Sequence, residues 1–253
     1  MIIQDLNLSS CYQGQGDVLL FIHGLGSSSA VWKKQLEALK QDHQLITVDL
    51  YGHGNNIKTP SDISIKQTAK IISEEIREKE LSNITFVGHS LGGLIAIEVA
   101  DHNKQLIDRV VLIDVPTKQT GMTLFNSLFL KMLEKDFPRV VKEHYKKMTR
   151  DERLLDELLE TALNTDKNSY YQYMKSLLET DYSKKARSLD AQIYLFVSSS
   201  LVRDKAKVTQ RMRKYGYERI QEDRLYYYSE TGHFLMIESA DDFNRDLLKI
   251  LSD

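Results

Sequence analysis

One serine of this chain stands in a setting that activates serine hydroxyls. The apolar run Ile84–Val87 leads into Gly88-His89-Ser90-Leu91-Gly92-Gly93, and a stretch of helical spacing follows at once. Glycines two positions before and after Ser90 remove the side chains that would clash in a sharp strand-to-helix turn. Such a turn lifts the hydroxyl clear of the sheet, beside the free N–H groups and positive dipole end of a helix. We therefore predict that Ser90 is a nucleophile, against the alternative of a glycine-rich turn that only packs tightly.

A serine hydroxyl becomes a good nucleophile only when a base takes its proton, and seven histidines compete for that role. His233 follows a probable final strand at Leu225–Tyr228 and a short turn, so it lies at the strand ends. Open α/β sheets place their chemistry on that rim, where Ser90 also lies. We predict His233 as the base; the alternative is a loop histidine with structural contacts only.

The other six histidines suit different positions. His89 lies beside Ser90 and is expected to point away from it. His23 and His53 stand in glycine-flanked turns, which we expect them to hold by hydrogen bonds. His43, His102 and His144 lie in polar stretches that are expected to be exposed. None of these positions favours the role of base.

The elements that must position Ser90 and His233 are short buried strands alternating with helices. Near-continuous apolar runs suit strands covered on both faces of a parallel sheet, and they occur at Val18–Ile22, Gln44–Val48, Ile84–Val87, Arg109–Ile113 and Ile193–Val197. Helical spacing lies between and after them, at Ala30–Leu39, Ile65–Lys79, Leu91–Asp101, Asp204–Tyr215 and Asp241–Leu251. The pattern predicts a doubly wound α/β protein. Residues 1–13 are expected to include an antiparallel edge strand.

The segment from Pro116 to Leu189 breaks this alternation. It contains no convincing strand, and its helices carry single apolar stripes that need a surface to cover, with Pro138 placed like a first-turn proline. We predict a core of residues 1–115 and 190–253 with a helical cap at 116–189. Several large cap side chains could line the site or only dock the cap: Phe125, Leu128, Phe129, Tyr170, Tyr171 and Tyr173.

Five motifs occur in the order found in a known superfamily. They are His23-Gly24-Leu25-Gly26, Asp49-Leu50-Tyr51-Gly52-His53-Gly54, the serine turn, Leu112-Ile113-Asp114-Val115-Pro116, and Gly232-His233-Phe234. With these motifs the chain resembles the α/β-hydrolases over nearly its whole length, close to the small cap-bearing esterases. The resemblance implies a mostly parallel sheet of the eight-stranded type, flanked by helices, with the helical cap inserted between two strands.

The carboxylate that orients the histidine has two candidates. By resemblance, most of these proteins carry it just after the strand that follows the cap, but here that strand is followed by Ser198-Ser199-Ser200. Asp204 comes late and is flanked by basic residues, as a helix N-terminal acid would be. Asp114 directly follows the buried run Arg109–Ile113, a position that a minority of similar hydrolases use. We favour Asp114 and keep Asp204, and the absence of any such acid, as alternatives.

The resemblance also implies two backbone donors for the developing oxyanion. They are the N–H of Leu91, directly after the nucleophile, and the N–H of Leu25 in the loop after the first buried strand. The alternative for the His23–Gly26 segment is an ordinary turn.

Together these features predict a serine hydrolase that cleaves small carboxylic esters through an acyl-enzyme intermediate, with Ser90, His233 and Asp114 as its triad. Thioesterase, lactonase and carbon–carbon bond hydrolase activities share the same logic. A rival of another class is a ligand-sensing protein of the same fold with negligible turnover.

Composition narrows the remaining classes. The 34 basic and 36 acidic residues give a net charge of −2, which argues against a nucleic-acid partner. No apolar run is long enough to span a bilayer, and no signal peptide is visible, so we expect a cytoplasmic protein without a membrane partner. The single Cys11 fits a reducing compartment. Without metal-ligand spacing, a phosphate loop or a dinucleotide motif, no cofactor is expected. The expected partner is a small ester substrate, and nothing specifies an oligomeric state.

Overall fold

The computed structural model describes residues 9–13, 16–118, 123–149 and 151–252. Its centre is one sheet with strand order β1-β3-β2-β4-β5-β6-β7. The strands are β1 (Ser9–Gln13), β2 (Val18–Ile22), β3 (Gln44–Val48), β4 (Ile84–His89), β5 (Ile107–Ile113), β6 (Gln192–Ser198) and β7 (Leu225–Tyr228). Strand β1 runs antiparallel to β3, and all the other neighbours pair in parallel. The predicted α/β class and the antiparallel edge strand are confirmed.

The described chain forms seven strands, whereas a sheet of the eight-stranded type was expected. Among the described residues, only Ser9–Gln13 precedes β2 as a strand, and it pairs with β3 at the edge of the sheet. The described chain therefore has one strand on the outer side of β3.

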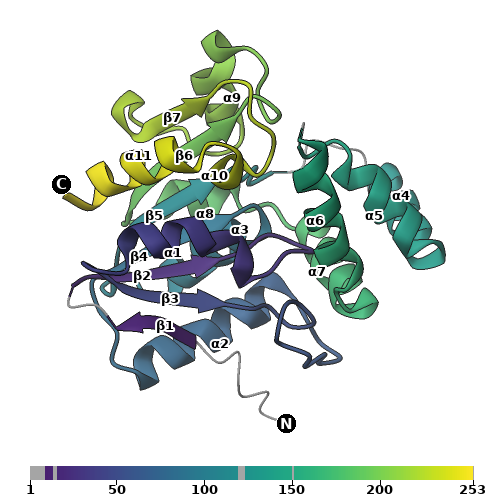
Figure 1. Ribbon diagram of the computed structural model, residues 1–253, viewed down its shortest axis with the longest axis horizontal. Coiled ribbons are helices and arrows are strands. Elements are labelled where there is room, and N and C mark those ends of the chain that lie inside the picture. Colours follow the sequence, from purple (N-terminus) through teal and green to yellow (C-terminus); the bar gives the residue numbers. More distant parts are fainter. Residues whose placement is uncertain (1–8, 14–15, 119–122, 150, 253) are drawn as a thin grey trace.

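Helices cover both faces of the sheet (Figure 1). The core helices are α1 (Lys33–Leu39), α2 (Ile65–Glu78), α3 (Leu91–His102), α8 (Ser183–Ser188), α9 (Val208–Lys214), α10 (Leu235–Glu238) and α11 (Ala240–Ser252), with short 3₁₀ turns at Ser29–Trp32, Lys205–Lys207 and Glu222–Arg224. Helices α2, α3, α8 and α9 contribute to one buried apolar cluster, and α1 and α11 to the other. This two-sided burial explains why the strands are almost continuously apolar.

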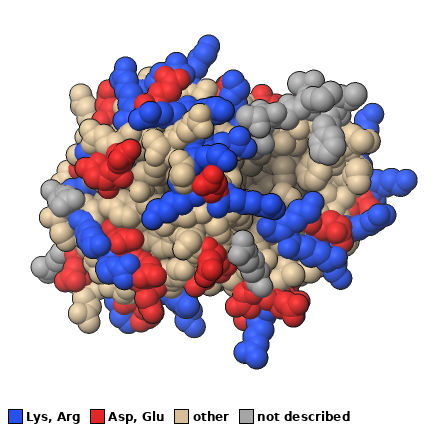
Figure 2. Space-filling model, turned by 90° about the horizontal axis from the view of Figure 1, so that it is seen from above, with Lys and Arg blue, Asp and Glu red and all other residues tan. Residues whose placement is uncertain are grey.

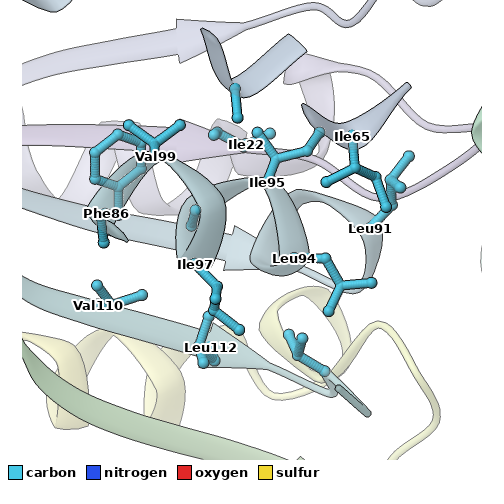
Figure 3. Close-up of a cluster of buried hydrophobic side chains, with 14 of the residues drawn as sticks. Ile22, Ile65, Phe86, Leu91, Leu94, Ile95, Ile97, Val99, Val110 and Leu112 are labelled. Atoms are coloured by element: carbon cyan, nitrogen blue, oxygen red, sulfur yellow. The ribbon is translucent and has the colours of Figure 1, made fainter. Parts of the chain in front are cut away.

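Helix α3 is the most deeply buried helix beside the site. Every residue from Leu91 to Ala100 is buried, including its two glycines. Its apolar side chains pack between the sheet and α2, as Figure 3 shows for Ile22, Ile65, Phe86, Leu91, Leu94, Ile95, Ile97, Val99, Val110 and Leu112. The helix that begins directly after Ser90 is thus held by the centre of the core.

Four helices inserted between β5 and β6 lie to one side of the sheet (Figure 1). They are α4 (Thr123–Lys135), α5 (Phe137–Tyr145), α6 (Glu152–Leu163) and α7 (Lys167–Glu179), and we call them the cap. Helix α8, which the predicted cap range included, packs instead against α3, where Lys185 contacts Glu98 and Asp101 at 2.9 and 3.0 Å.

Aspartates begin three of the cap helices. Asp136, Asp151 and Asp166 each accept a hydrogen bond from a backbone N–H in the first turn of α5, α6 and α7. Pro138 lies in the first turn of α5, as predicted, where its missing N–H has no intrahelical partner to lose. The cap is therefore divided into short helices by local sequence signals.

Candidate active site

Ser90 occupies a tight turn between β4 and α3. Its backbone has φ 51° and ψ −115°, a conformation that few non-glycine residues adopt. The flanking glycines are required by close contacts: a Cβ at Gly88 would lie 2.6 Å from the Gly93 Cα, and one at Gly92 would lie 2.2 Å from the Ile22 carbonyl oxygen. The Ser90 N–H donates to the Ile113 carbonyl at 2.9 Å. The turn is thus held by the end of the neighbouring strand.

His233 and Asp114 meet at the same edge of the sheet. Asp114 directly follows β5, is fully buried and has φ 50°. Its Oδ2 lies 3.1 Å from Nδ1 of His233, whose side chain remains 17% exposed. Since a carboxylate oxygen accepts, Nδ1 is the donor of this contact, and Nε2 is the ring nitrogen that does not contact Asp114.

Ser198, at the end of β6, fixes the Asp114 carboxylate. Its backbone N–H donates to Oδ1 at 2.7 Å, and its hydroxyl donates to Oδ2. Sequence reasoning missed this residue, although a signal existed: β5 and β6 are neighbouring parallel strands, so the residues that follow their ends must lie side by side. Ser198 occupies the position where most similar proteins are expected to carry the acid, and it binds Asp114 at the end of the adjacent strand.

Asp204, the other candidate acid, lies elsewhere. It caps the 3₁₀ turn Lys205–Lys207 by accepting from the Ala206 N–H, and it pairs with Lys207 at 3.0 Å. Its side chain is about half exposed. The structure brings Asp114, and not Asp204, to His233.

Ser90 and His233 line one cavity of about 520 Å³ between the core and the cap. The cap contributes apolar side chains such as Phe129, Tyr170 and Met174. Seen from above, the molecule has a hollow with Lys and Arg side chains near it (Figure 2), and the described residues that line the cavity include one Lys and no Arg, Asp or Glu. The cavity can hold a small, largely apolar molecule next to the serine.

Two backbone N–H groups near Ser90 are available as donors. The N–H groups of Leu25 and Leu91 take part in none of the hydrogen bonds found among the described residues. Leu91 is the first residue of α3, where the N–H groups have no intrahelical acceptor. Leu25 belongs to the loop after β2 and lines the cavity. Both predicted donors are therefore free of other partners.

His23 and His53 hold the loop that carries Leu25, as predicted. The Leu50 N–H donates to Nε2 of His23 at 3.1 Å, and the Gly26 N–H donates to Nε2 of His53 at 3.0 Å. Their Nδ1 atoms donate to the carbonyls of Gly24 and Tyr51. Burial lowers the pKa of both, that of His53 to about 3, so each stays neutral and keeps one accepting nitrogen.

His89 contacts His233. Its Nε2 donates to the His233 carbonyl at 3.0 Å, and the two rings lie 4.6 Å apart between centroids. Burial, assisted by the nearby His233, lowers the pKa of His89 well below its ordinary value. His89 is thus a neutral donor that holds the loop carrying His233.

The end of α5 and the residues just after it contact two loops of the site, the loop after β2 that carries Leu25 and the loop that carries His233. The sequence did not reveal these contacts. The Tyr145 hydroxyl donates to the Leu25 carbonyl at 2.8 Å. The His233 N–H donates to the Met148 carbonyl at 2.5 Å. Tyr145 and Met148, three positions apart, therefore tie the end of α5 and the segment after it to the loops that carry Leu25 and His233.

The large cap side chains named from the sequence lie in different environments. Phe129 and Tyr170 line the cavity, and His144 lines it too, so the expectation that His144 is exposed was wrong. Tyr173 is buried and hydrogen-bonds Thr68, Tyr171 is half-buried, and Leu128 is 55% exposed. The side chain of Phe125 lies outside the described residues. Both alternatives, lining and docking, thus apply to different members of the set.

Two searches of the described residues bear on other kinds of site. No group of three or more His, Cys, Asp or Glu side chains is placed to hold a metal ion in this part of the chain. Among the described helices, none combines the length and apolarity needed to cross a membrane.

The chain belongs to the α/β-hydrolase family, whose fold matches residues 17–249. A putative carbamate hydrolase, RutD, of Agrobacterium fabrum is 36% identical over 105 residues, which cover 41% of this chain and 40% of that protein. An (E)-2-((N-methylformamido)methylene)succinate hydrolase of Acinetobacter baylyi is 29% identical over 108 residues, 43% of this chain and 41% of that protein. Matches to the first curated relatives span only 29% to 41% of their length.

Solved structures share the fold over most of the chain. A bromoperoxidase from Bacillus anthracis has a TM-score of 0.83 at 20% identity, covering 95% of this chain and 94% of that one. An esterase from Exiguobacterium antarcticum has a TM-score of 0.82 at 19% identity, with the same coverage. At these identities the likeness establishes the fold. The two curated relatives described above are both named as hydrolases.

Proposed function

We propose that this hydrolase cleaves small carboxylic esters through an acyl-enzyme formed on Ser90. The observation that carries the proposal is the contact of His233 Nδ1 with the buried Asp114 carboxylate, in a ring that lines the same cavity as Ser90. With Nδ1 engaged by the carboxylate, Nε2 is the nitrogen that would accept the serine proton.

In the proposed reaction His233 takes the Ser90 proton as Oγ attacks the ester carbonyl. Asp114 stabilises the imidazolium that forms, and its carboxylate accepts two hydrogen bonds from Ser198. His233 then gives the proton to the leaving alcohol. Water, activated by the same histidine, releases the acid and restores Ser90.

The N–H groups of Leu25 and Leu91 would receive the oxyanion of the tetrahedral intermediate. The positive end of α3 lies beside this point, because Leu91 is its first residue. Since both donors are backbone groups, the leucine side chains are free to contribute apolar surface. We expect the cap to select among esters through the apolar part of the cavity.

A fluorophosphonate probe tests the proposal. The wild type and Ser200→Ala, whose serine also borders the cavity, are expected to be labelled, and Ser90→Ala is not. Absence of labelling in the wild type, or equal labelling of Ser90→Ala, would overturn the enzyme reading and favour a ligand-sensing role. A panel of p-nitrophenyl esters, a thioester and a lactone then ranks the acyl-transfer alternatives.

A further inference from the structure

The cavity has an asymmetric charge. Among its described lining residues there is no Asp or Glu, and Lys147 is the one Lys or Arg. The neighbouring His144 is neutral near pH 7, because burial, with His233 and Lys147 nearby, lowers its pKa to about 4. A bound molecule therefore meets apolar walls and one ammonium group, with no described carboxylate on the lining.

Lys147 differs from the neighbouring lysine in its contacts with the described residues. It forms no ion pair with a described residue, whereas the adjacent Lys146 contacts Glu143 at 2.7 Å and does not line the cavity. Lys147 is exposed to solvent at the cavity border. Its electrostatic interaction with Glu143 is weaker than that of the ion-paired Lys146, so the Lys147 ammonium can still bind an anion that enters from solution.

The backbone around Lys147 is held against the catalytic loops. Two residues before it, Tyr145 donates to the Leu25 carbonyl, and directly after it, Met148 accepts from the His233 N–H. The ammonium group therefore lies no further than the length of one lysine side chain from this backbone. The backbone is itself held beside the loops that carry Leu25 and His233. A substrate that contacts both ends must carry its charge away from its scissile carbonyl.

We infer that Lys147 selects substrates with a carboxylate remote from the ester bond, such as half-esters of short dicarboxylic acids. The apolar walls accept the connecting methylene chain, and the ammonium binds the free carboxylate. This inference rests on the proposed ester hydrolysis and names its substrate class. Because Lys147 is exposed, solvent weakens the contact, and the selectivity is expected to be about tenfold.

The test compares mono-(4-nitrophenyl) adipate with its neutral methyl ester, after subtraction of the uncatalysed rates. The wild type is expected to show the higher kcat/KM for the anionic ester, mainly through KM. In Lys147→Gln the ratio of the two kcat/KM values falls about tenfold, in Lys147→Arg it persists, and in Lys146→Gln it is unchanged. Added salt lowers the ratio in the wild type.

A ratio that stays the same in Lys147→Gln, or that falls equally in Lys146→Gln, overturns the inference while leaving ester hydrolysis intact. If neither ester is turned over and fluorophosphonate fails to label Ser90, the proposed function fails. Binding of adipate, measured by calorimetry, then still decides the charge selectivity: about tenfold weaker binding to Lys147→Gln supports it, and equal binding rejects it. Thermal melting of each variant verifies that it is folded.

Discussion

The two halves of this site are held in different ways. In the core half, Ser90 and Asp114 each follow a strand, and their N–H groups donate to the carbonyls of Ile113 and Phe196 on neighbouring strands. In the cap half, the end of α5 reaches the site through the Tyr145 hydroxyl and the Met148 carbonyl. The difference suggests that the sheet fixes the reacting groups, whereas the cap adjusts the loops around them and shapes the substrate cavity.

The largest effect is expected from the core half. Asp114→Asn should lower kcat on the order of 10⁴-fold, because a neutral amide neither selects the Nδ1–H tautomer nor stabilises the imidazolium. Steady-state hydrolysis of a p-nitrophenyl ester measures it. Asp204→Asn, at an exposed position bound to Lys207, is the matched control and should keep wild-type kcat. The reverse result would transfer the role of acid to Asp204.

A second prediction concerns how the donor loop is held. The pKa of folded His53 is about 3, against 6.5 for an exposed imidazole, so the unfolded chain binds more protons as the pH falls below about 6.5. Stability is therefore complete above that pH and decreases toward pH 3. Between pH 7 and pH 5 this histidine alone should remove about 2 kcal/mol of unfolding free energy.

Urea denaturation of the wild type and His53→Asn at both pH values checks this prediction. The variant is expected to be less stable than the wild type at pH 7, because the Gly26 N–H loses its acceptor. Between pH 7 and pH 5 its unfolding free energy should fall by about 2 kcal/mol less than that of the wild type. An identical loss in both proteins would mean that His53 is not buried in its neutral form.

A third prediction sharpens the role of the core half. Ser198→Ala removes the hydroxyl donor to Asp114 Oδ2 but keeps the backbone donor to Oδ1. We expect kcat to fall roughly tenfold, with the acidic limb of the pH–rate profile shifted, because the carboxylate loses one of its charge-assisted hydrogen bonds. Ser199→Ala, at the next position, gives the comparison: its hydroxyl donates to the Thr231 carbonyl and does not touch Asp114. Equal losses in both variants would point to a general disturbance of this loop.

The smallest of these effects is expected from the cap half. Tyr145→Phe removes the hydrogen bond to the Leu25 carbonyl and leaves the ring packed, so the donor loop is loosened without a cavity. We predict a loss of a few-fold in kcat. Tyr173→Phe, which removes a hydroxyl that hydrogen-bonds Thr68 and not Leu25, should leave the kinetics unchanged. A loss above 10³-fold in Tyr145→Phe would place the cap among the groups that fix the chemistry.

The same contrast separates what the sequence reveals from what it does not. Strand periodicity, the glycines around Ser90 and the position of His233 were readable, because they depend on local geometry and on strand ends that meet at one edge. The choice between Asp114 and Asp204 stayed open in the sequence, since it depends on which loop approaches His233. The structure resolves that geometry through the neighbouring ends of β5 and β6.

The contacts of the cap could not be predicted from its own sequence. Tyr145 lies 120 positions from Leu25, and no periodicity specifies how an amphipathic helix is rotated over a distant loop. The same holds for α8, whose six residues follow the cap in sequence but pack against α3. Such placements are decided by tertiary packing, which overrides local pattern.

The most direct measurement of the central claim is a crystal structure of the protein after reaction with a fluorophosphonate. We predict a covalent bond from phosphorus to Ser90 Oγ, with the phosphoryl oxygen accepting hydrogen bonds from the Leu25 and Leu91 N–H groups and His233 Nε2 facing Oγ. A phosphonyl group on another residue, or on Ser90 with its oxygen turned away from both N–H groups, would contradict the account.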